Sequence, residues 1–164
     1  MLDRRTFVLS AAAAGFAACS RVRADDAGTT MDDRIFEVTH TDAEWRRLLT
    51  RGQYFVLRRE DTELAFTSVL LEEKRSGVYS CAGCGLAVFA SSAKFDSGTG
   101  WPSFAAPLDH AVLTKRDASF GMVRTSVICR RCGGHLGHLF DDGPAPTGMR
   151  YCINGVAMNF APSP

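Results

Sequence analysis

Two pairs of cysteines in the chain have the spacing of a metal site. They are Cys81 with Cys84 and Cys129 with Cys132, and a glycine follows each pair directly. Two residues between thiolates let both sulfur atoms face one ion, so the two pairs supply the four ligands of a tetrahedral zinc. The alternative is a thioredoxin-like redox pair, which needs only one Cys-x-x-Cys on a βαβ unit, and the sequence has no such alternation. A closed four-sulfur site leaves no position for a substrate, so we expect the zinc to be structural.

A further cysteine, Cys152, lies in a strand-like run at residues 149–155. A lone thiol in such a run is more often an inert buried residue than a nucleophile. Arg150 lies two residues before it and Asn154 two residues after it, so on an extended strand the three side chains share one face. A guanidinium lowers the pKa of a neighbouring thiol, and the thiolate is the nucleophilic form. These neighbours favour Cys152 as a nucleophile.

Two histidines, His135 and His138, directly follow the second cysteine pair. Imidazoles in proteins act as proton donors and acceptors or as metal ligands. Because the four cysteines already complete a zinc site, we expect these two histidines to take part in acid–base chemistry or to hydrogen-bond a substrate.

Trp101 and Phe104 belong to a segment, residues 94–104, whose two glycines and one proline predict a tight loop. One interpretation is that these rings close the hydrophobic core. The other is that they form an aromatic wall beside the thiolate. Such a wall suits a small apolar substrate group such as a methylthio group, because sulfur and methyl contacts with aromatic rings are favourable.

The elements that must position these residues are short. Thr41 and Glu44 have the spacing of a capping box, and Gly52 is a stop signal, so we predict an amphipathic helix over residues 42–51 that serves as scaffold. Residues 53–71 fit both a helical turn and extended chain, and their class stays open. Beyond Gly77, short runs of Val, Tyr, Phe and Ile broken by Gly and Pro predict antiparallel strands at residues 78–80, 86–89, 122–129 and 149–153.

The length of 164 residues, with 46% hydrophobic and 23% charged residues, predicts one globular domain. The formal net charge is +1, but four arginines and one aspartate lie in the first 24 residues. The remainder holds 15 basic and 17 acidic residues, a net charge of −2. This balance argues against binding nucleic acid through bulk charge.

The first 24 residues have the layout of an export signal, with Arg4 and Arg5 before an apolar run at residues 6–18. That run is too short for a permanent membrane span, which takes about 20 residues. The arginine pair resembles a bacterial twin-arginine signal, with a generic secretory signal or a buried apolar helix as alternatives. Cys19 closes a possible lipoprotein box, whereas residues 22–24 offer an ordinary cleavage point. Acylation at Cys19 and cleavage after residue 24 both predict a periplasmic location, and acylation would anchor the protein to a lipid membrane. After the signal we expect a linker at residues 25–34 and one domain at residues 35–164.

Taken together, the motifs resemble those of the B-type methionine sulfoxide reductases from about residue 35 to residue 160. The resemblance rests on the two cysteine pairs and on four further runs: residues 100–104, 135–140, 142–144 and 150–154. It implies a mainly β (α+β) domain of two small antiparallel sheets with short N-terminal helices, clipped together by zinc. It also implies reduction of the R epimer of methionine sulfoxide, free or in proteins, and so the repair of oxidised proteins.

The resemblance implies a role for each matching residue. Cys152 attacks the sulfoxide sulfur and becomes a sulfenic acid. His135 and His138 protonate or hold the departing oxygen, because a sulfoxide oxygen leaves poorly unless it is protonated. Three polar residues position the site and tune the thiol: Asp142, Arg150 and Asn154. Two aromatic residues bind the substrate: Trp101 as the wall for its methyl group, and Phe104.

One position departs from the family pattern. Many members carry a resolving cysteine just before the Gly-Trp-Pro-Ser run, and this chain has Thr99 there. Threonine forms no disulfide, so we expect an external thiol, from a thioredoxin-like donor or a small molecule, to reduce the sulfenic acid directly. Gly155 stands where serine is frequent, and we expect little from that change. We expect a monomer that binds no nucleic acid and meets the membrane only through its signal or lipid anchor.

Three alternatives compete with this function. A zinc-stabilised binding module, in which Cys152 is a bystander, needs a basic face that the net charge of −2 disfavours. A thiol–disulfide protein needs a paired redox cysteine. The third alternative keeps the family fold without the activity, but Thr99 does not imply it, because the reductive half-reaction needs only Cys152.

Overall fold

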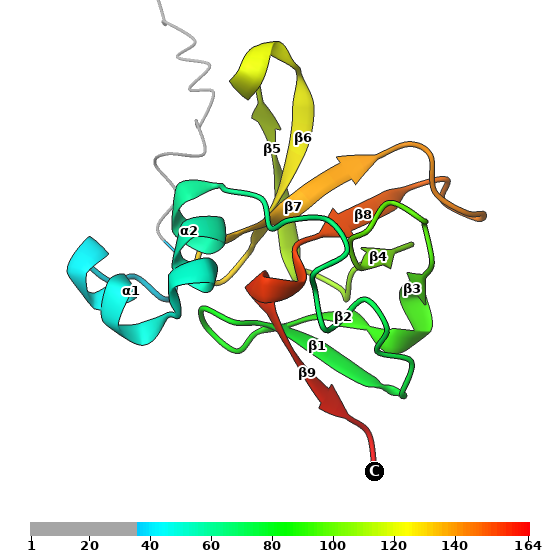
Figure 1. The fold of residues 1–164 in the computed structure, drawn as a ribbon, viewed down its shortest axis with the longest axis horizontal. Coiled ribbons are helices and arrows are strands. Elements are labelled where there is room, and N and C mark those ends of the chain that lie inside the picture. Colours follow the sequence, from blue (N-terminus) through cyan, green and yellow to red (C-terminus); the bar gives the residue numbers. More distant parts are fainter. Residues whose placement is uncertain (1–35) are drawn as a thin grey trace, which may run out of the picture.

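The computed structural model describes residues 36–164 (Figure 1). The export signal, the lipid-anchor position Cys19 and the linker predicted for residues 25–34 lie outside the described residues, so they stay predictions. Within the described part of the chain, no helix combines the length and the apolar character that a membrane span requires.

Two short helices precede the sheets: α1 (Asp42–Leu48) and α2 (Arg51–Arg59). The predicted capping box is confirmed, because the Thr41 hydroxyl accepts from the N–H of Glu44 and the Glu44 carboxylate accepts from the N–H of Thr41. The single helix over residues 42–51 is wrong, because Thr50 forms a second capping box that begins α2. Gly52 therefore lies in the first turn of α2, where an added Cβ would lie 3.2 Å from Val156.

The strands form two antiparallel sheets, as predicted. The smaller sheet has the order β2-β1-β9. Its strands are β1 (Gly77–Cys81), β2 (Ala87–Ala90) and β9 (Met158–Pro162). The larger sheet has the order β3-β4-β8-β7-β6-β5. Its strands are β3 (Lys94–Phe95), β4 (Ser103–Phe104), β5 (Val112–Asp117), β6 (Arg124–Cys129), β7 (His135–Phe140) and β8 (Arg150–Ile153).

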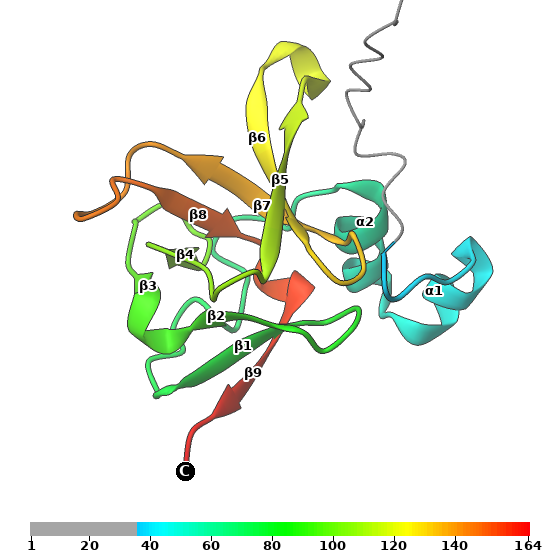
Figure 2. The same cartoon turned by 180° about the vertical axis from the view of Figure 1, so that it is seen from behind.

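The hydrophobic core joins the two sheets through aromatic contacts. The rings of Phe89 and Phe104 stack with centroids 4.4 Å apart, and Tyr79 meets Phe104 edge-on at 5.0 Å. Helix α2 packs on β7 and on the short 3₁₀ turn at Gly155–Ala157. Seen from behind in Figure 2, the β5–β6 hairpin projects at the end of the molecule opposite the smaller sheet.

The segment whose class the sequence left open divides into two parts. Residues 53–59 complete α2, and residues 60–71 form a loop without helix or strand. In Figure 1 this loop leaves α2 and runs across the larger sheet before the chain enters β1. We call residues 60–71 the covering loop.

Candidate active site

Cys152 lies on β8, which is an inner strand of the larger sheet. Its cross-strand neighbours are Ser103 on β4 and His138 on β7. Directly opposed residues in an antiparallel pair project from the same face, so His138 is brought next to the thiol. Gly137 allows the close approach of the two strands, because an added Cβ would overlap the carbonyl oxygen of Cys152.

Cys152 opens into a cavity of about 120 Å³. Its walls come from five parts of the chain that are separated in the sequence. Its lining residues are Thr62, Trp101, Arg124, Gly137, His138, Phe140, Cys152 and Asn154. A nucleophile, an imidazole and an indole ring therefore share one small cavity.

The pKa of the Cys152 thiol is raised above its ordinary value. Burial is the largest cause, because it disfavours the charged thiolate. The Arg150 cation, with hydrogen bonding from Thr99, Arg150 and Ser103, acts in the opposite direction and does not overcome burial. The predicted effect of Arg150, a lowering of the thiol pKa, is therefore confirmed in sign, but burial outweighs it and the net shift is upward.

Arg150 is held by Asp142 in a two-point ion pair. Its Nε and Nη2 donate to Oδ1 and Oδ2 of Asp142, each over 2.8 Å, and its guanidinium lies 4.5 Å from the centre of the Phe140 ring. The Arg150 side chain is 8% exposed, whereas that of Asp142 is 59% exposed. Asp142 is not part of the cavity lining and acts on the site by orienting Arg150.

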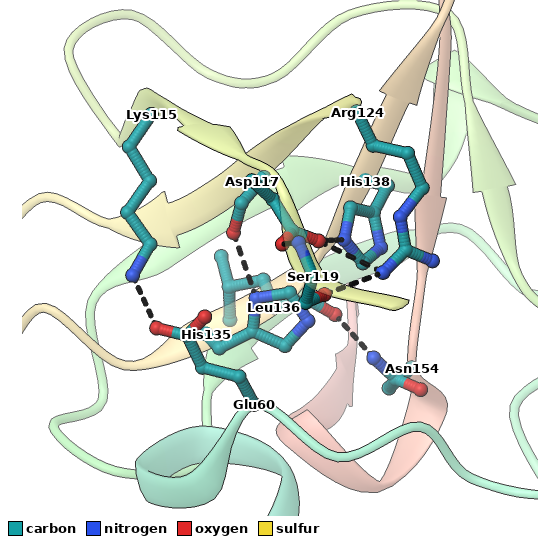
Figure 3. A network of polar contacts seen from close by, with 10 residues as sticks. Glu60, Lys115, Asp117, Ser119, Arg124, His135, Leu136, His138 and Asn154 are labelled. Carbon is teal, nitrogen blue, oxygen red and sulfur yellow. Dashed lines mark hydrogen bonds and ion pairs between the residues drawn. The ribbon is translucent and has the colours of Figure 1, made fainter. Parts of the chain in front are cut away.

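His138 belongs to a polar network that the sequence did not reveal (Figure 3). Its Nε2 lies 2.9 Å from Oδ2 of Asp117, which also accepts from Nη2 of Arg124 over 2.8 Å. Hydrogen bonds from Ser119 are the largest cause that lowers the pKa of Asp117, so its carboxylate stays charged. The pKa of His138 is lowered, because burial outweighs the attraction of Asp117.

His135 lies behind His138, with ring centroids 5.1 Å apart. Its Nδ1 is 2.9 Å from the hydroxyl of Ser126, and its buried Nε2 has no hydrogen-bond partner among the described residues. Burial lowers the pKa of His135 to about 4, so the ring is neutral. His135 faces a second cavity of about 850 Å³, which shares His138 with the Cys152 cavity. The structure thus brings only His138 into the wall beside the thiol.

The two aromatic residues predicted to bind substrate have different positions. Trp101 lines the Cys152 cavity, and its Nε1 donates to the carbonyl oxygen of Glu63 over 3.0 Å. Phe104 is fully buried in the core and does not line that cavity, so its predicted contact with substrate is not supported. The physical reason is strand alternation: Ser103 faces the thiol, which turns the next residue to the opposite side.

Asn154 joins the end of β8 to the covering loop. Its Nδ2 donates to the carbonyl of Leu136 over 3.0 Å, and its Oδ1 accepts from the N–H of Glu63, also over 3.0 Å. Thr62 and Glu63 were missed by sequence reasoning, as were Asp117 and Arg124. These residues belong to no motif, and only the fold brings them to Cys152.

The four predicted metal ligands come together, and none of them lines the Cys152 cavity. Their sulfur atoms all lie within 4.8 Å of one another, with Cys81 and Cys132 at 3.7 Å and Cys84 and Cys129 at 3.5 Å. Ligands about 2.3 Å from a tetrahedral zinc are separated by about 3.8 Å, so the cluster fits that ion. The glycine after each pair has positive φ, +72° at Gly85 and +68° at Gly133, as its turn requires. The cluster connects β1 with β6 and can hold a metal between the two sheets.

The fold and the site define a SelR-domain protein, and the SelR domain model matches residues 49–162. Curated relatives carry the name peptide methionine sulfoxide reductase MsrB. One from Thiobacillus denitrificans is 54% identical over 123 residues, which cover 74% of this chain and 93% of the relative. One from Leptospira interrogans is 49% identical over 126 residues, covering 76% and 96% respectively. One from Methanosarcina barkeri is 52% identical over 124 residues, covering 75% and 87%. The chain belongs to the MsrB family.

Proposed function

We propose that the chain is an oxidoreductase that reduces the R epimer of methionine sulfoxide, with Cys152 as the nucleophile. One observation carries this proposal: Cys152 and His138 face the same small cavity beside the ring of Trp101. The cavity can receive a methylthio group against the indole ring, with the sulfoxide sulfur at the thiol. Membership of the MsrB family supports the reaction, and the geometry of the cavity supports the roles proposed for Cys152, His138 and Trp101.

In the first half-reaction, oxygen passes from the substrate to the enzyme. The Cys152 sulfur attacks the sulfoxide sulfur. A proton that reaches the sulfoxide oxygen from the side on which His138 lies makes this oxygen a better leaving group. The S–O bond of the substrate then breaks as its protonated oxygen passes to the Cys152 sulfur. The transient bond between the two sulfur atoms breaks with its electron pair on the methionine sulfur, so methionine leaves and Cys152 becomes a sulfenic acid. The substrate is reduced by two electrons, and the thiol is oxidised by two electrons.

In the second half-reaction, an external thiol restores Cys152. Among the described residues, the cysteines are Cys152 and the four of the metal cluster, so a resolving thiol is not at hand. One external thiol forms a mixed disulfide with Cys152 and releases water, and a second thiol releases the free enzyme and a disulfide. A thioredoxin-like protein and a small thiol both satisfy this chemistry.

Zinc is the metal that the four-thiolate cluster suits best. Cys81, Cys84, Cys129 and Cys132 would hold it, and it would supply a structural link between the two sheets. We assign it no step in the reaction, because four protein ligands complete its coordination.

The proposed location is the periplasm, which the sequence of the first 24 residues supports. The periplasm is kept oxidising, so a dedicated thiol donor is implied there. We propose further that the domain works as a monomer. The mass of the exported protein distinguishes cleavage after Ala24 from acylation at Cys19, and light scattering reports the oligomeric state.

The direct test is dithiothreitol-driven reduction of the separated R and S epimers of a methionine sulfoxide derivative. We expect turnover of the R epimer alone, and none by Cys152→Ser with the same zinc content and circular dichroism. If zinc-loaded wild-type protein turns over neither epimer, the enzyme proposal fails and a zinc-stabilised binding module becomes the better account.

A further inference from the structure

Glu63 lies in the covering loop, and each of its polar groups is hydrogen-bonded to a residue in or next to the active site. Its N–H donates to Oδ1 of Asn154, and its carbonyl oxygen accepts from Nε1 of Trp101, each over 3.0 Å. Its two carboxylate oxygens accept from the N–H groups of Gly155, over 2.6 Å, and Val156, over 2.9 Å. Glu63 thus connects the residues that directly follow β8 to the indole ring that lines the Cys152 cavity.

These contacts restrain the Trp101 ring in a specific way. An indole has a single hydrogen-bond donor, Nε1–H, and here it points at the backbone of Glu63. The position of that backbone is set by the carboxylate, because hydrogen bonds to a charged acceptor are roughly twice as strong as neutral ones. The covering loop touches the same tryptophan segment once more, where the N–H of Phe66 donates to the carbonyl of Gly100 over 2.8 Å.

We infer that Glu63 is a positioning residue, whose carboxylate holds the Trp101 ring at a fixed place relative to the Cys152 sulfur. The inference rests on the proposed function, in which that ring receives the substrate methyl group. Glu63 does not line the Cys152 cavity, but it contacts Trp101 and Asn154, which do.

This role predicts a particular kinetic pattern. The ring contacts the methyl group both in the bound substrate and during the reaction, so its displacement weakens ground-state and transition-state binding alike. We expect Glu63→Ala to raise KM for the R sulfoxide about 10-fold, with kcat changed less than about 3-fold. Glu63→Gln keeps one amide acceptor, so its effect should fall between those of Glu63→Ala and wild type.

The matched control is Glu72→Ala, which removes a carboxylate from the segment that follows the covering loop. The Glu72 side chain is 81% exposed and its ion-pair partner is Lys74, at 3.7 Å. We expect this variant to keep the wild-type KM and kcat.

A second readout does not depend on turnover. The chain has two tryptophans, so a ¹H–¹⁵N spectrum shows two indole resonances, and Trp101→Phe identifies that of Trp101. In Glu63→Ala the Trp101 resonance should move while that of Trp45, buried against α2, stays in place and reports an intact fold. The control variant should leave both resonances unchanged.

The outcomes separate the two hypotheses. Wild-type protein without activity contradicts the proposed function, and the indole spectrum still tests the positioning of Trp101. Active wild type with an unmoved Trp101 resonance or an unchanged KM in Glu63→Ala overturns the inference. If Glu63→Ala does not fold, Glu63→Gln is compared in wild-type and Trp101→Phe backgrounds. Equal changes in KM in the two backgrounds then overturn the inference, because the effect must pass through the indole N–H.

Discussion

The hydroxyl of Thr99 lies 4.0 Å from the sulfur of Cys152. The same hydroxyl is 2.8 Å from that of Ser97, so the loop holds residue 99 beside the nucleophile. The position at which the resemblance expects a resolving cysteine thus lies beside the nucleophile, and the residue there is a threonine, which forms no disulfide.

A thiol at residue 99 should therefore restore an intramolecular route. We expect Thr99→Cys to form a disulfide between residues 99 and 152 after one equivalent of the R sulfoxide, since the two side chains are already in contact range. Mass spectrometry of the peptides without reduction would detect the bond. Thr99→Ser, which keeps a hydroxyl, should show no such bond, and its absence in Thr99→Cys would contradict the placement described here.

The Arg150 cation should control the ionisation of Cys152. Burial raises the pKa of this thiol and Arg150 opposes that effect, so Arg150→Met should raise the pKa further. The pH profile of iodoacetamide alkylation, measured on zinc-loaded protein, would move to higher pH. Asp142→Asn should shift it less in the same direction, because it loosens Arg150. Arg116→Met, at an exposed position of β5, is the control, and an unmoved profile in Arg150→Met would refute the assignment.

Loss of the metal should lower the stability of the domain, because the metal links the two sheets and takes no part in the reaction. Apparent binding free energies of structural zinc sites are on the order of 10 kcal/mol, comparable to the stability of a whole domain. We expect Cys129→Ser to bind less than one zinc per chain and to melt at a lower temperature than wild type, as measured by metal analysis and circular dichroism. Cys152→Ser should retain both the zinc and the melting temperature. A Cys129→Ser protein with full zinc and an unchanged melting curve would rule out a structural metal.

His135 should make the protein less stable in acid. Burial lowers its pKa from 6.5 to about 4, so between these values the unfolded chain binds the proton more readily than the folded protein. The free energy of unfolding should therefore fall as the pH decreases from about 6.5 to about 4. Urea titrations at several pH values should show a shallower fall for His135→Gln over this window, while the contributions of the other histidines remain. Parallel curves for the two proteins would contradict the neutral, buried state of this ring.

A serine at residue 155 should affect stability more than we expected from the sequence, because the space around Gly155 is filled. An added Cβ would overlap the Ser68 hydroxyl and lie 2.8 Å from the Ser68 Cβ. Gly155→Ser should therefore destabilise the protein by about 1–3 kcal/mol, the usual cost of overpacking, and Ser68→Gly in the same chain should restore most of the loss. A double-mutant cycle by urea denaturation measures this coupling, and additive effects would show that the two positions do not share the space.

The parts of the site that the sequence revealed are those held by local spacing. The cysteine pairs are knuckles closed by their own glycines, and Arg150 reaches Cys152 along one strand. Asp117 arrives from β5 and Glu63 from a loop, and no pattern along the chain links either residue to Cys152. The predicted contact of Phe104 with the substrate is not supported by the structure. The side of β4 on which Phe104 lies depends on the register of β4 with β8, and only the fold sets that register. Four strands, β1, β2, β6 and β8, were predicted from their β-branched and aromatic runs, whereas β3, β4, β5, β7 and β9 were not. The break between α1 and α2 depends on the second capping box at Thr50.

Strand β8 is hydrogen-bonded to β4 along one edge and to β7 along the other, and this pairing fixes the backbone that carries Cys152. The main chain of Cys152 has a paired strand on each side, so we expect its amide to exchange hydrogen with solvent slowly. Another wall of the cavity, Trp101, is attached to the covering loop by two hydrogen bonds: its ring donates to the carbonyl of Glu63, and the carbonyl of Gly100, just before it, accepts from the N–H of Phe66. The reacting sulfur therefore takes its place from the sheet, whereas the indole ring beside it takes its place from a loop outside the sheet.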